Sequence, residues 1–68
     1  MENTQRYLRT KLAASHVGLS HKTFEAMRLK GTGPAYVKLP GKRGSVIYRR
    51  EDLDAWLAEH LVAPVSNR

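Results

Sequence analysis

Two short helical runs, each closed by a glycine, are the feature that most constrains how this 68-residue chain can fold. Thr10 can cap a helix that begins at Lys11, because its hydroxyl can accept a hydrogen bond from a free amide of the first turn. Gly18 ends this helix, since glycine adopts the left-handed conformation of a C-cap without a Cβ clash. Ser20 is then the expected cap of a second helix, which runs up to Gly31.

The residue types within these two runs follow a fixed spacing. With Thr10 as the first position, the fifth is small, the ninth is glycine, and the fourth, eighth, tenth, fifteenth and eighteenth are apolar. The seven residues at these positions are Ala13, Ala14, Val17, Gly18, Leu19, Phe24 and Met27. A small Ala14 lets two helices cross closely, and Phe24 and Met27, three residues apart, share an inward face. This spacing is typical of a DNA-binding helix-turn-helix.

The pattern changes period after residue 34. The β-prone runs 36–39 and 45–49 surround a basic, glycine-rich stretch at 40–44, which predicts a hairpin. A third helix is expected from about Glu51, with an acidic first turn that suits the helix dipole. Its buried face is expected to carry four apolar residues at three- and four-residue spacing: Leu53, Trp56, Leu57 and Leu61. The sequence thus predicts an α+β fold with two helices, a two-stranded hairpin and a C-terminal helix.

Charge is divided unevenly along the chain, whose net charge is +6. Residues 22–50 hold eight Lys and Arg against one acid, whereas residues 51–60 hold four acids and no Lys or Arg. A positive side of this kind suits a polyanion, because contacts to phosphates release condensed counterions. The alternative interpretation is a solvated surface that keeps a small protein soluble.

Several function classes find no support in the sequence. The absence of cysteine excludes a disulfide scaffold, a thiolate zinc site and a cysteine nucleophile. The three histidines, His16, His21 and His60, show no spacing that converges on a metal, and no catalytic triad is visible. We therefore expect no enzyme, no metal, no cofactor and no small-molecule ligand. No apolar run approaches the roughly 18 residues of a membrane span, so we expect a cytoplasmic protein. That it is bacterial and nucleoid-associated is what the family resemblance described next implies.

Four segments resemble the small MerR-like winged helix-turn-helix family of phage and genomic-island excisionases and AlpA-type regulators. They are Leu8–Ala14, Gly18–Ser20, Gly33–Leu39 and Ile47–Leu57, and the resemblance covers 54 of the 68 residues. The Tyr-x-x-x-Asp-Leu-x-x-Trp-Leu segment that starts at Tyr48 is its most specific part. The resemblance implies a second helix in the major groove, a hairpin wing at the minor groove or backbone, and short, often repeated DNA sites.

The chain departs from the family pattern in two ways. Its wing tip is longer, so that either Lys42 or Arg43 could enter a groove. Leu12 stands where an acidic residue is common and Leu29 where a polar one is. We expect both leucines to be exposed and to mark a self-association surface.

The helical period of about 100° per residue divides the side chains of the second helix between an inward and an outward face. With Phe24 inward, Lys22, Ala26 and Leu29 lie roughly opposite, and His21 and Glu25 lie on one flank. Lysine can donate to guanine, glutamate can accept from cytosine, and alanine can approach a thymine methyl. Glu25 could instead pair with Arg28 on the helix surface. The residues predicted to contact DNA are Thr10, Lys11, His21, Lys22, Thr23, Glu25, Ala26, Arg28, Lys38, Lys42, Arg43 and Arg49.

The expected domain spans residues 7–62, between a flexible arm at 1–6 and a flexible tail at 63–68. Because the chain is nearly all domain, the leading hypothesis is an excisionase, a recombination directionality factor that binds repeated duplex sites cooperatively and directs an integrase towards excision. Its expected partners are double-stranded DNA, an integrase and further copies of itself. The alternatives are an AlpA-type transcriptional regulator of a mobile element, an RNA- or ribosome-associated protein, and a protein-interaction module.

Overall fold

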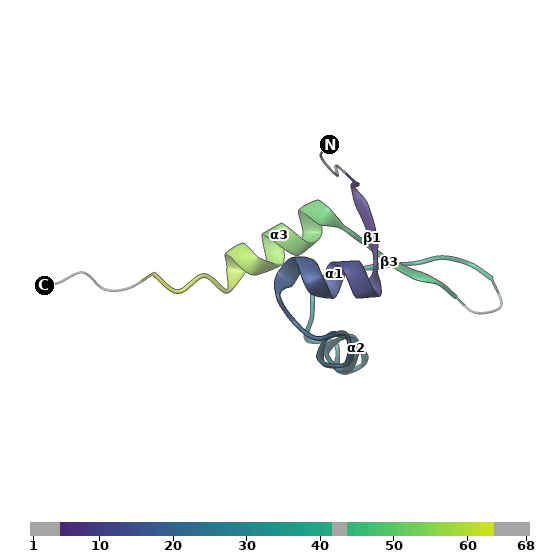
Figure 1. Ribbon diagram of the computed structural model, residues 1–68, viewed down its shortest axis with the longest axis horizontal. Coiled ribbons are helices and arrows are strands. Elements are labelled where there is room, and N and C mark those ends of the chain that lie inside the picture. Colours follow the sequence, from purple (N-terminus) through teal and green to yellow (C-terminus); the bar gives the residue numbers. More distant parts are fainter. Residues whose placement is uncertain (1–4, 42–43, 64–68) are drawn as a thin grey trace, which may run out of the picture.

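The computed structural model describes residues 5–41 and 44–63. Within these residues it has three helices and a three-stranded antiparallel sheet, so the fold is a small α+β winged helix-turn-helix (Figure 1). The elements in chain order are β1 (Tyr7–Arg9), α1 (Thr10–Val17), α2 (His21–Lys30), β2 (Val37–Lys38), β3 (Val46–Arg49) and α3 (Arg50–Glu59). Residues 1–4 and 64–68, most of the predicted arm and tail, lie outside the described residues.

The turn between the first two helices forms as the sequence predicts. Gly18 has a φ of 80°, and its amide donates to the Ser15 carbonyl at 3.1 Å, while the Leu19 amide donates to the Ala14 carbonyl at 2.9 Å. Ser20 caps α2, because its hydroxyl accepts a hydrogen bond from the Thr23 amide at 3.1 Å. The two glycine-closed helices are therefore confirmed.

The expected cap at Thr10 is wrong. α1 begins at Thr10 itself, and Arg9, in extended conformation, occupies the N-cap position without a side-chain hydrogen bond to the helix. The helix starts one residue earlier than expected, so the N-cap position falls on an arginine, whose side chain has no oxygen to accept a hydrogen bond from the first-turn amides. The Thr10 hydroxyl instead accepts a hydrogen bond from the Arg28 guanidinium at 3.2 Å.

The strand β1 is absent from the sequence-based prediction. It pairs antiparallel with β3, with Tyr7 opposite Arg49, Leu8 opposite Tyr48 and Arg9 opposite Ile47. β3 is therefore the central strand, in the order β1-β3-β2. Three residues carry too little local signal to predict a strand, and it forms because the pairing buries Leu8 to 8% exposure.

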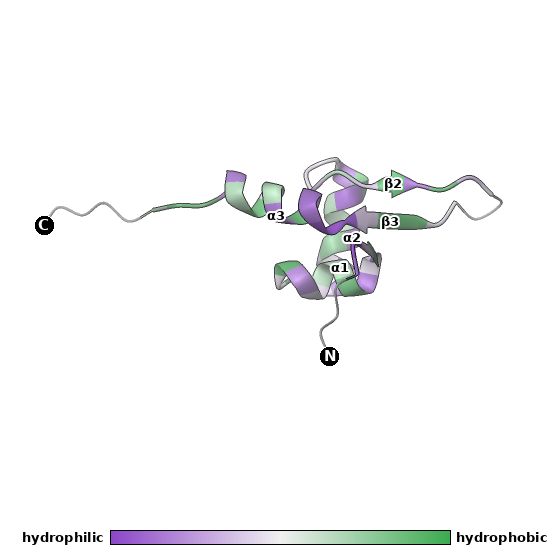
Figure 2. Cartoon of the chain, turned by 90° about the horizontal axis from the view of Figure 1, so that it is seen from above, coloured by the Kyte–Doolittle hydropathy of each residue, from purple (hydrophilic) through white to green (hydrophobic). Residues whose placement is uncertain are grey.

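The predicted hairpin is confirmed, with shorter strands than the β-prone runs suggest. Val37 lies opposite Ile47 and Lys38 opposite Val46, and the Leu39 amide extends the pairing by donating to the Ser45 carbonyl at 2.8 Å. Figure 2 shows this hairpin projecting from one side of the helices while α3 leaves from the other. The hairpin is the wing of the fold.

The core gathers small side chains from α1 and large ones from the other elements. Its members are Leu8, Ala13, Ala14, Phe24, Tyr48 and Leu53. The Tyr48 ring lies 4.9 Å from that of Phe24 and 5.9 Å from that of Tyr36, measured between centroids. Ala14, 1% exposed, permits the close helix crossing that the sequence predicts.

The buried face predicted for α3 is correct only at its N-terminal end. Leu53 is fully buried, but Trp56 is half-buried against His60, Leu57 is 38% exposed, and Leu61 lies beyond the helix at 76% exposure. The first turns of α3 pack beside α1 and β3, whereas its last turns run out past the rest of the fold (Figure 1). Apolar spacing alone cannot show where a helix leaves its partners.

Candidate nucleic-acid interface

The helix α2 turns one face to the core and the opposite face outwards. Phe24 is 1% exposed, while Lys22, Ala26 and Leu29 on the other side are all exposed. In Figure 1 α2 is seen nearly end-on at the lower edge of the molecule, away from α3. This orientation leaves a convex helix face, of the width that a DNA major groove admits.

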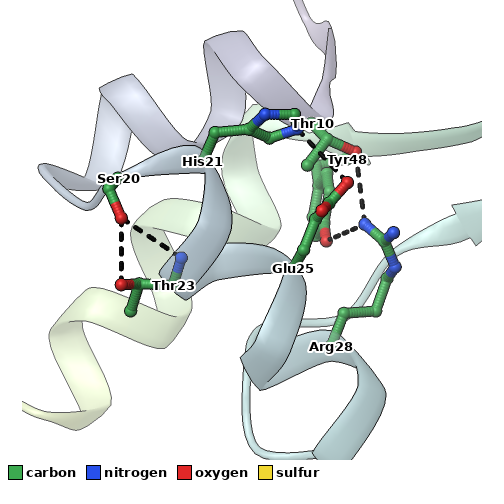
Figure 3. Close-up of polar contacts among 7 residues, drawn as sticks. All are labelled: Thr10, Ser20, His21, Thr23, Glu25, Arg28 and Tyr48. Atoms are coloured by element: carbon green, nitrogen blue, oxygen red, sulfur yellow. Dashed lines mark hydrogen bonds and ion pairs between the residues drawn. The ribbon is translucent and has the colours of Figure 1, made fainter.

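Glu25 and His21 form a pair on the flank of that face. The His21 Nε2 and a Glu25 carboxylate oxygen are 3.3 Å apart, and both side chains are about half exposed (Figure 3). The alternative that Glu25 pairs with Arg28 is wrong, because the Arg28 side chain turns towards α1 and β3. The carboxylate stays within reach of a donor such as the cytosine amino group.

Arg28 connects α2 to the remainder of the fold. Its Nη1 donates to the Thr10 hydroxyl and to the Tyr48 hydroxyl, each at 3.2 Å (Figure 3). Its guanidinium carbon also lies 5.9 Å from the centroid of the Tyr36 ring, a cation–π distance. One side chain thus links α2 to the start of α1, to β3 and to the chain leading into β2.

These contacts bear on the residues that the sequence predicts to contact DNA. Arg28 and Thr10 are hydrogen-bonded to each other, so their first role is to hold α2 at a fixed angle. A phosphate contact by the other guanidinium nitrogens of Arg28 stays a prediction. Lys11, next along α1, is exposed. Thr23 is exposed in the first turn of α2, where its hydroxyl accepts from Ser20 Oγ at 2.9 Å and keeps its own proton to donate.

Lys38 is a basic side chain on the first strand of the wing. It is exposed on β2, and its aliphatic chain crosses the hairpin over Gly44. Gly44 has a φ of +57°, and a Cβ at this position would lie only 2.8 Å from the Lys38 Cε. Glycine therefore makes room for the lysine chain. Lys42 and Arg43, predicted at the wing tip, lie outside the described residues.

Arg49 is a weaker candidate for a DNA contact than its sequence position suggests. Its Nε and Nη2 donate to the two oxygens of Asp52 at 2.8 and 3.1 Å, and its Nη1 lies 3.3 Å from Glu51. Asp52 raises the pKa of Arg49 above its ordinary value, through this hydrogen bond and its charge. Because two carboxylates compensate the guanidinium, it adds little to the positive field of the wing.

Two polar contacts that organise the site could not be expected from the sequence. His16 Nε2 and Asp54 Oδ1 are 2.7 Å apart and join α1 to α3. The Tyr48 hydroxyl is the acceptor that orients Arg28. Neither contact has a local signal in the sequence. His16 and Asp54 lie 38 residues apart in the chain, and Arg28 and Tyr48 lie 20 residues apart.

Leu12 and Leu29 are both exposed, as predicted, at 52% and 83%. That they mark a self-association surface stays a prediction. Leu29 lies on the outer side of α2, whereas Leu12 borders an open pocket of about 300 Å³. The residues that line this pocket are Gln5, Leu8, Leu12, Ser15, His16 and Arg50.

Most acids of the described residues are gathered on one helix. Glu51, Asp52, Asp54 and Glu59 all belong to α3, which lies beyond α1 as seen from α2 (Figure 1). The exposed lysines Lys22 and Lys38 belong to α2 and the wing, and Glu25 is the acid of α2. A helix-turn-helix with an outward recognition helix and a basic wing beside it defines a small winged helix-turn-helix protein that binds double-stranded DNA.

Comparison with known families agrees with this class. Residues 7–61 match the helix-turn-helix domain family, and the chain belongs to it. This is the family of excisionase-like and AlpA-like small DNA-binding proteins, which bind specific sequences and are generally not enzymes. A comparison with curated proteins found no match.

In the part of the chain that the structure describes, none of the helices has both the length and the apolar character of a membrane span. Within residues 5–41 and 44–63, no three His, Cys, Asp or Glu side chains gather so that they could hold a metal ion.

The Arg28–Tyr48 bond generates a prediction about stability. Tyr48→Phe removes the hydroxyl but keeps the ring, and we expect it to lower the free energy of unfolding by about 1 kcal/mol. In an Arg28→Met background the same change should cost close to nothing, because the donor is already gone. Urea denaturation of the four proteins of this double-mutant cycle measures the coupling.

Tyr36→Phe is the matched control, since it keeps the ring that Arg28 approaches, and its effect should be small in both backgrounds. An equal cost of Tyr48→Phe with and without Arg28 would contradict the proposed link.

Proposed function

We propose that this protein is an excisionase of the MerR-like winged-helix type, a recombination directionality factor that binds repeated sites on duplex DNA cooperatively and directs an integrase towards excision. The observation that carries the proposal is the outward face of α2, with Lys22 exposed on it, beside a wing on which Lys38 is exposed, in a chain of the excisionase-like family. The proposed setting is a mobile element in a bacterium.

The proposed contacts divide into base reading and phosphate positioning. In the major groove, Lys22 donates to guanine, Glu25 accepts from cytosine, and Ala26 approaches a thymine methyl, with His21 beside them. The proposed phosphate contacts, which fix register but carry no sequence information, come from α1, α2 and the wing. They are Thr10, Lys11, Thr23, Arg28, Lys38, Lys42, Arg43 and, more weakly, Arg49.

The small size of the module supports binding in several copies. A single module of this kind buries roughly 600–1,000 Å² of protein surface on DNA, which allows only modest affinity for one site. Copies on adjacent repeats gain affinity if neighbours also touch each other. The Leu12 pocket is the proposed contact, because it lies apart from the face of α2 and stays open when that face enters a groove.

An AlpA-type transcriptional regulator is the second candidate. The same family contains regulators of this type. The DNA-contact residues would be the same in both cases, and the two functions differ in what the bound protein acts on.

Two lysine variants test the division of labour on DNA. Lys22→Ala should relax sequence preference, because it removes a base-reading donor, and should cost about 1–3 kcal/mol of binding on the preferred site. Lys38→Ala should weaken binding to all sequences about equally and reduce the slope of log affinity against log salt by roughly one. Fluorescence anisotropy on preferred and scrambled duplexes at several salt concentrations measures both.

Lys30→Ala, which removes one charge from the end of α2, is the control for charge alone and should leave sequence preference unchanged. A Lys38→Ala protein that prefers a different sequence at unchanged salt slope would contradict this assignment.

Cooperative assembly is a second test. In gel shifts on duplexes with two or more adjacent sites, we expect stepwise complexes in which the second copy binds more tightly than the first. Leu12→Ser should abolish this gain while it leaves affinity for a single site unchanged, because Leu12 lies outside the face of α2. A single complex with no higher species on multi-site DNA would argue against assembly.

Deletion of the gene separates the two candidate functions. An excisionase predicts that excision of the resident element falls by at least tenfold in quantitative PCR of the junctions and is restored by wild type but not by Lys22→Ala. A regulator predicts changed transcripts nearby with excision unaltered at constant integrase level. Expression of the integrase from an independent promoter keeps these two readouts apart.

A further inference from the structure

The outer face of α2 carries an exposed leucine. Leu29 is 83% exposed and is the most exposed large apolar side chain of the three described helices. Its neighbours along the outer side of the helix are Glu25, Ala26 and Lys30, of which only Ala26 is apolar. Leu12, the comparable leucine on α1, is less exposed and borders a pocket.

Helix geometry puts Leu29 in the row that faces away from the core. At 1.5 Å of rise per residue, Ala26 and Leu29 are about 4.5 Å apart along the axis, and Lys22 and Leu29 about 10 Å. The row Lys22–Ala26–Leu29 therefore spans about three base-pair steps of 3.4 Å. It consists of one cation followed by two apolar groups.

The chemistry of the major groove offers one partner for such groups. Thymine presents a C5 methyl there, whereas the other groove positions of the four bases that carry sequence information are hydrogen-bond donors or acceptors. A protein partner would need a broader apolar surface than one leucine and one alanine among charges. The small apolar surface formed by Ala26 and Leu29 therefore suits a methyl group better than a protein interface.

We propose that Leu29, together with Ala26, reads thymine methyl groups next to the base pair contacted by Lys22. The proposal rests on the proposed function, in which α2 enters the major groove. It makes Leu29 a specificity-determining residue and assigns it to DNA rather than to self-association.

The experiment replaces thymine by deoxyuridine, which lacks only the methyl group. The full chain is first used to select its preferred duplex from a random library, and each thymine of that duplex is then replaced singly. One buried methyl corresponds to about a fourfold change in affinity. We expect a weakening of this size at one or two adjacent base pairs with wild type, and no weakening at one of these positions with Leu29→Ala.

Leu61→Ala is the matched control, because it shortens a leucine that is 76% exposed past the end of α3, and it should retain the whole uridine penalty. Leu29→Ala removes an exposed side chain, so its thermal melt should match that of wild type. Wild-type binding that is equally tight to thymine and uridine duplexes would overturn the inference, and so would a penalty that persists unchanged in Leu29→Ala. A Leu29→Ala protein that loses self-association in sedimentation but keeps the penalty would assign the leucine to a protein contact instead.

The same measurements distinguish a wrong role for Leu29 from a wrong proposed function. If wild type ignores the methyl groups while Lys22→Ala still relaxes sequence preference, the helix enters the groove and only the role of Leu29 is wrong. If no duplex is enriched from the library, the proposed function fails, and this inference fails with it.

Discussion

The contact between Phe24 and Tyr48 is the interaction on which the remaining structure depends. It joins the middle of α2 to the central strand of the sheet, with ring centroids 4.9 Å apart and both residues 1% exposed. With Phe24 fixed inwards, the helical period turns Lys22 and Ala26 outwards. The same tyrosine places its hydroxyl where the Arg28 guanidinium can donate to it. One ring pair thus sets both the depth and the rotation of the recognition helix.

Elements that carry their own local signals could be predicted from the sequence. Gly18 and Ser20 act through hydrogen bonds within a few residues, so the turn and the start of α2 follow from residue type alone. The wing follows in the same way from two β-prone runs around a glycine-rich stretch. The outward row of α2 needs only the periodicity and the identification of Phe24 as the buried residue.

Contacts between distant segments could not be predicted from local signals. β1 exists because β3 pairs with it, and that pairing in turn places Thr10 beside Arg28 rather than in a cap. Leu61 has the spacing of a buried residue but lies where α3 has passed its last neighbour. Arg49 has the charge of a DNA-binding residue, yet the helix that starts after it brings Asp52 to its guanidinium. In each case the outcome depends on a partner that only the fold supplies.

The acids of α3 pair with nearby groups and not with the exposed lysines of α2 and β2. Asp52 is hydrogen-bonded to Arg49 and Asp54 to His16, so two of these carboxylates are compensated locally. The lysines of α2 and β2 keep their charge towards solvent. A charge distribution of this kind orients a protein as it approaches a polyanion and raises the rate of productive encounters.

The size of the proposed reading surface bears on the proposal that this protein binds DNA in several copies. If Lys22, Glu25, Ala26 and Leu29 each read one base, a single copy distinguishes about four base pairs, and each correct contact contributes about 1–3 kcal/mol. A four-base-pair site recurs by chance every few hundred base pairs, while a genome presents roughly 10⁶–10⁹ competing sites. One copy therefore cannot mark a unique place on a chromosome. Several copies on adjacent repeats multiply the number of bases read, and the specificity then resides in the spacing of the repeats as much as in any one of them.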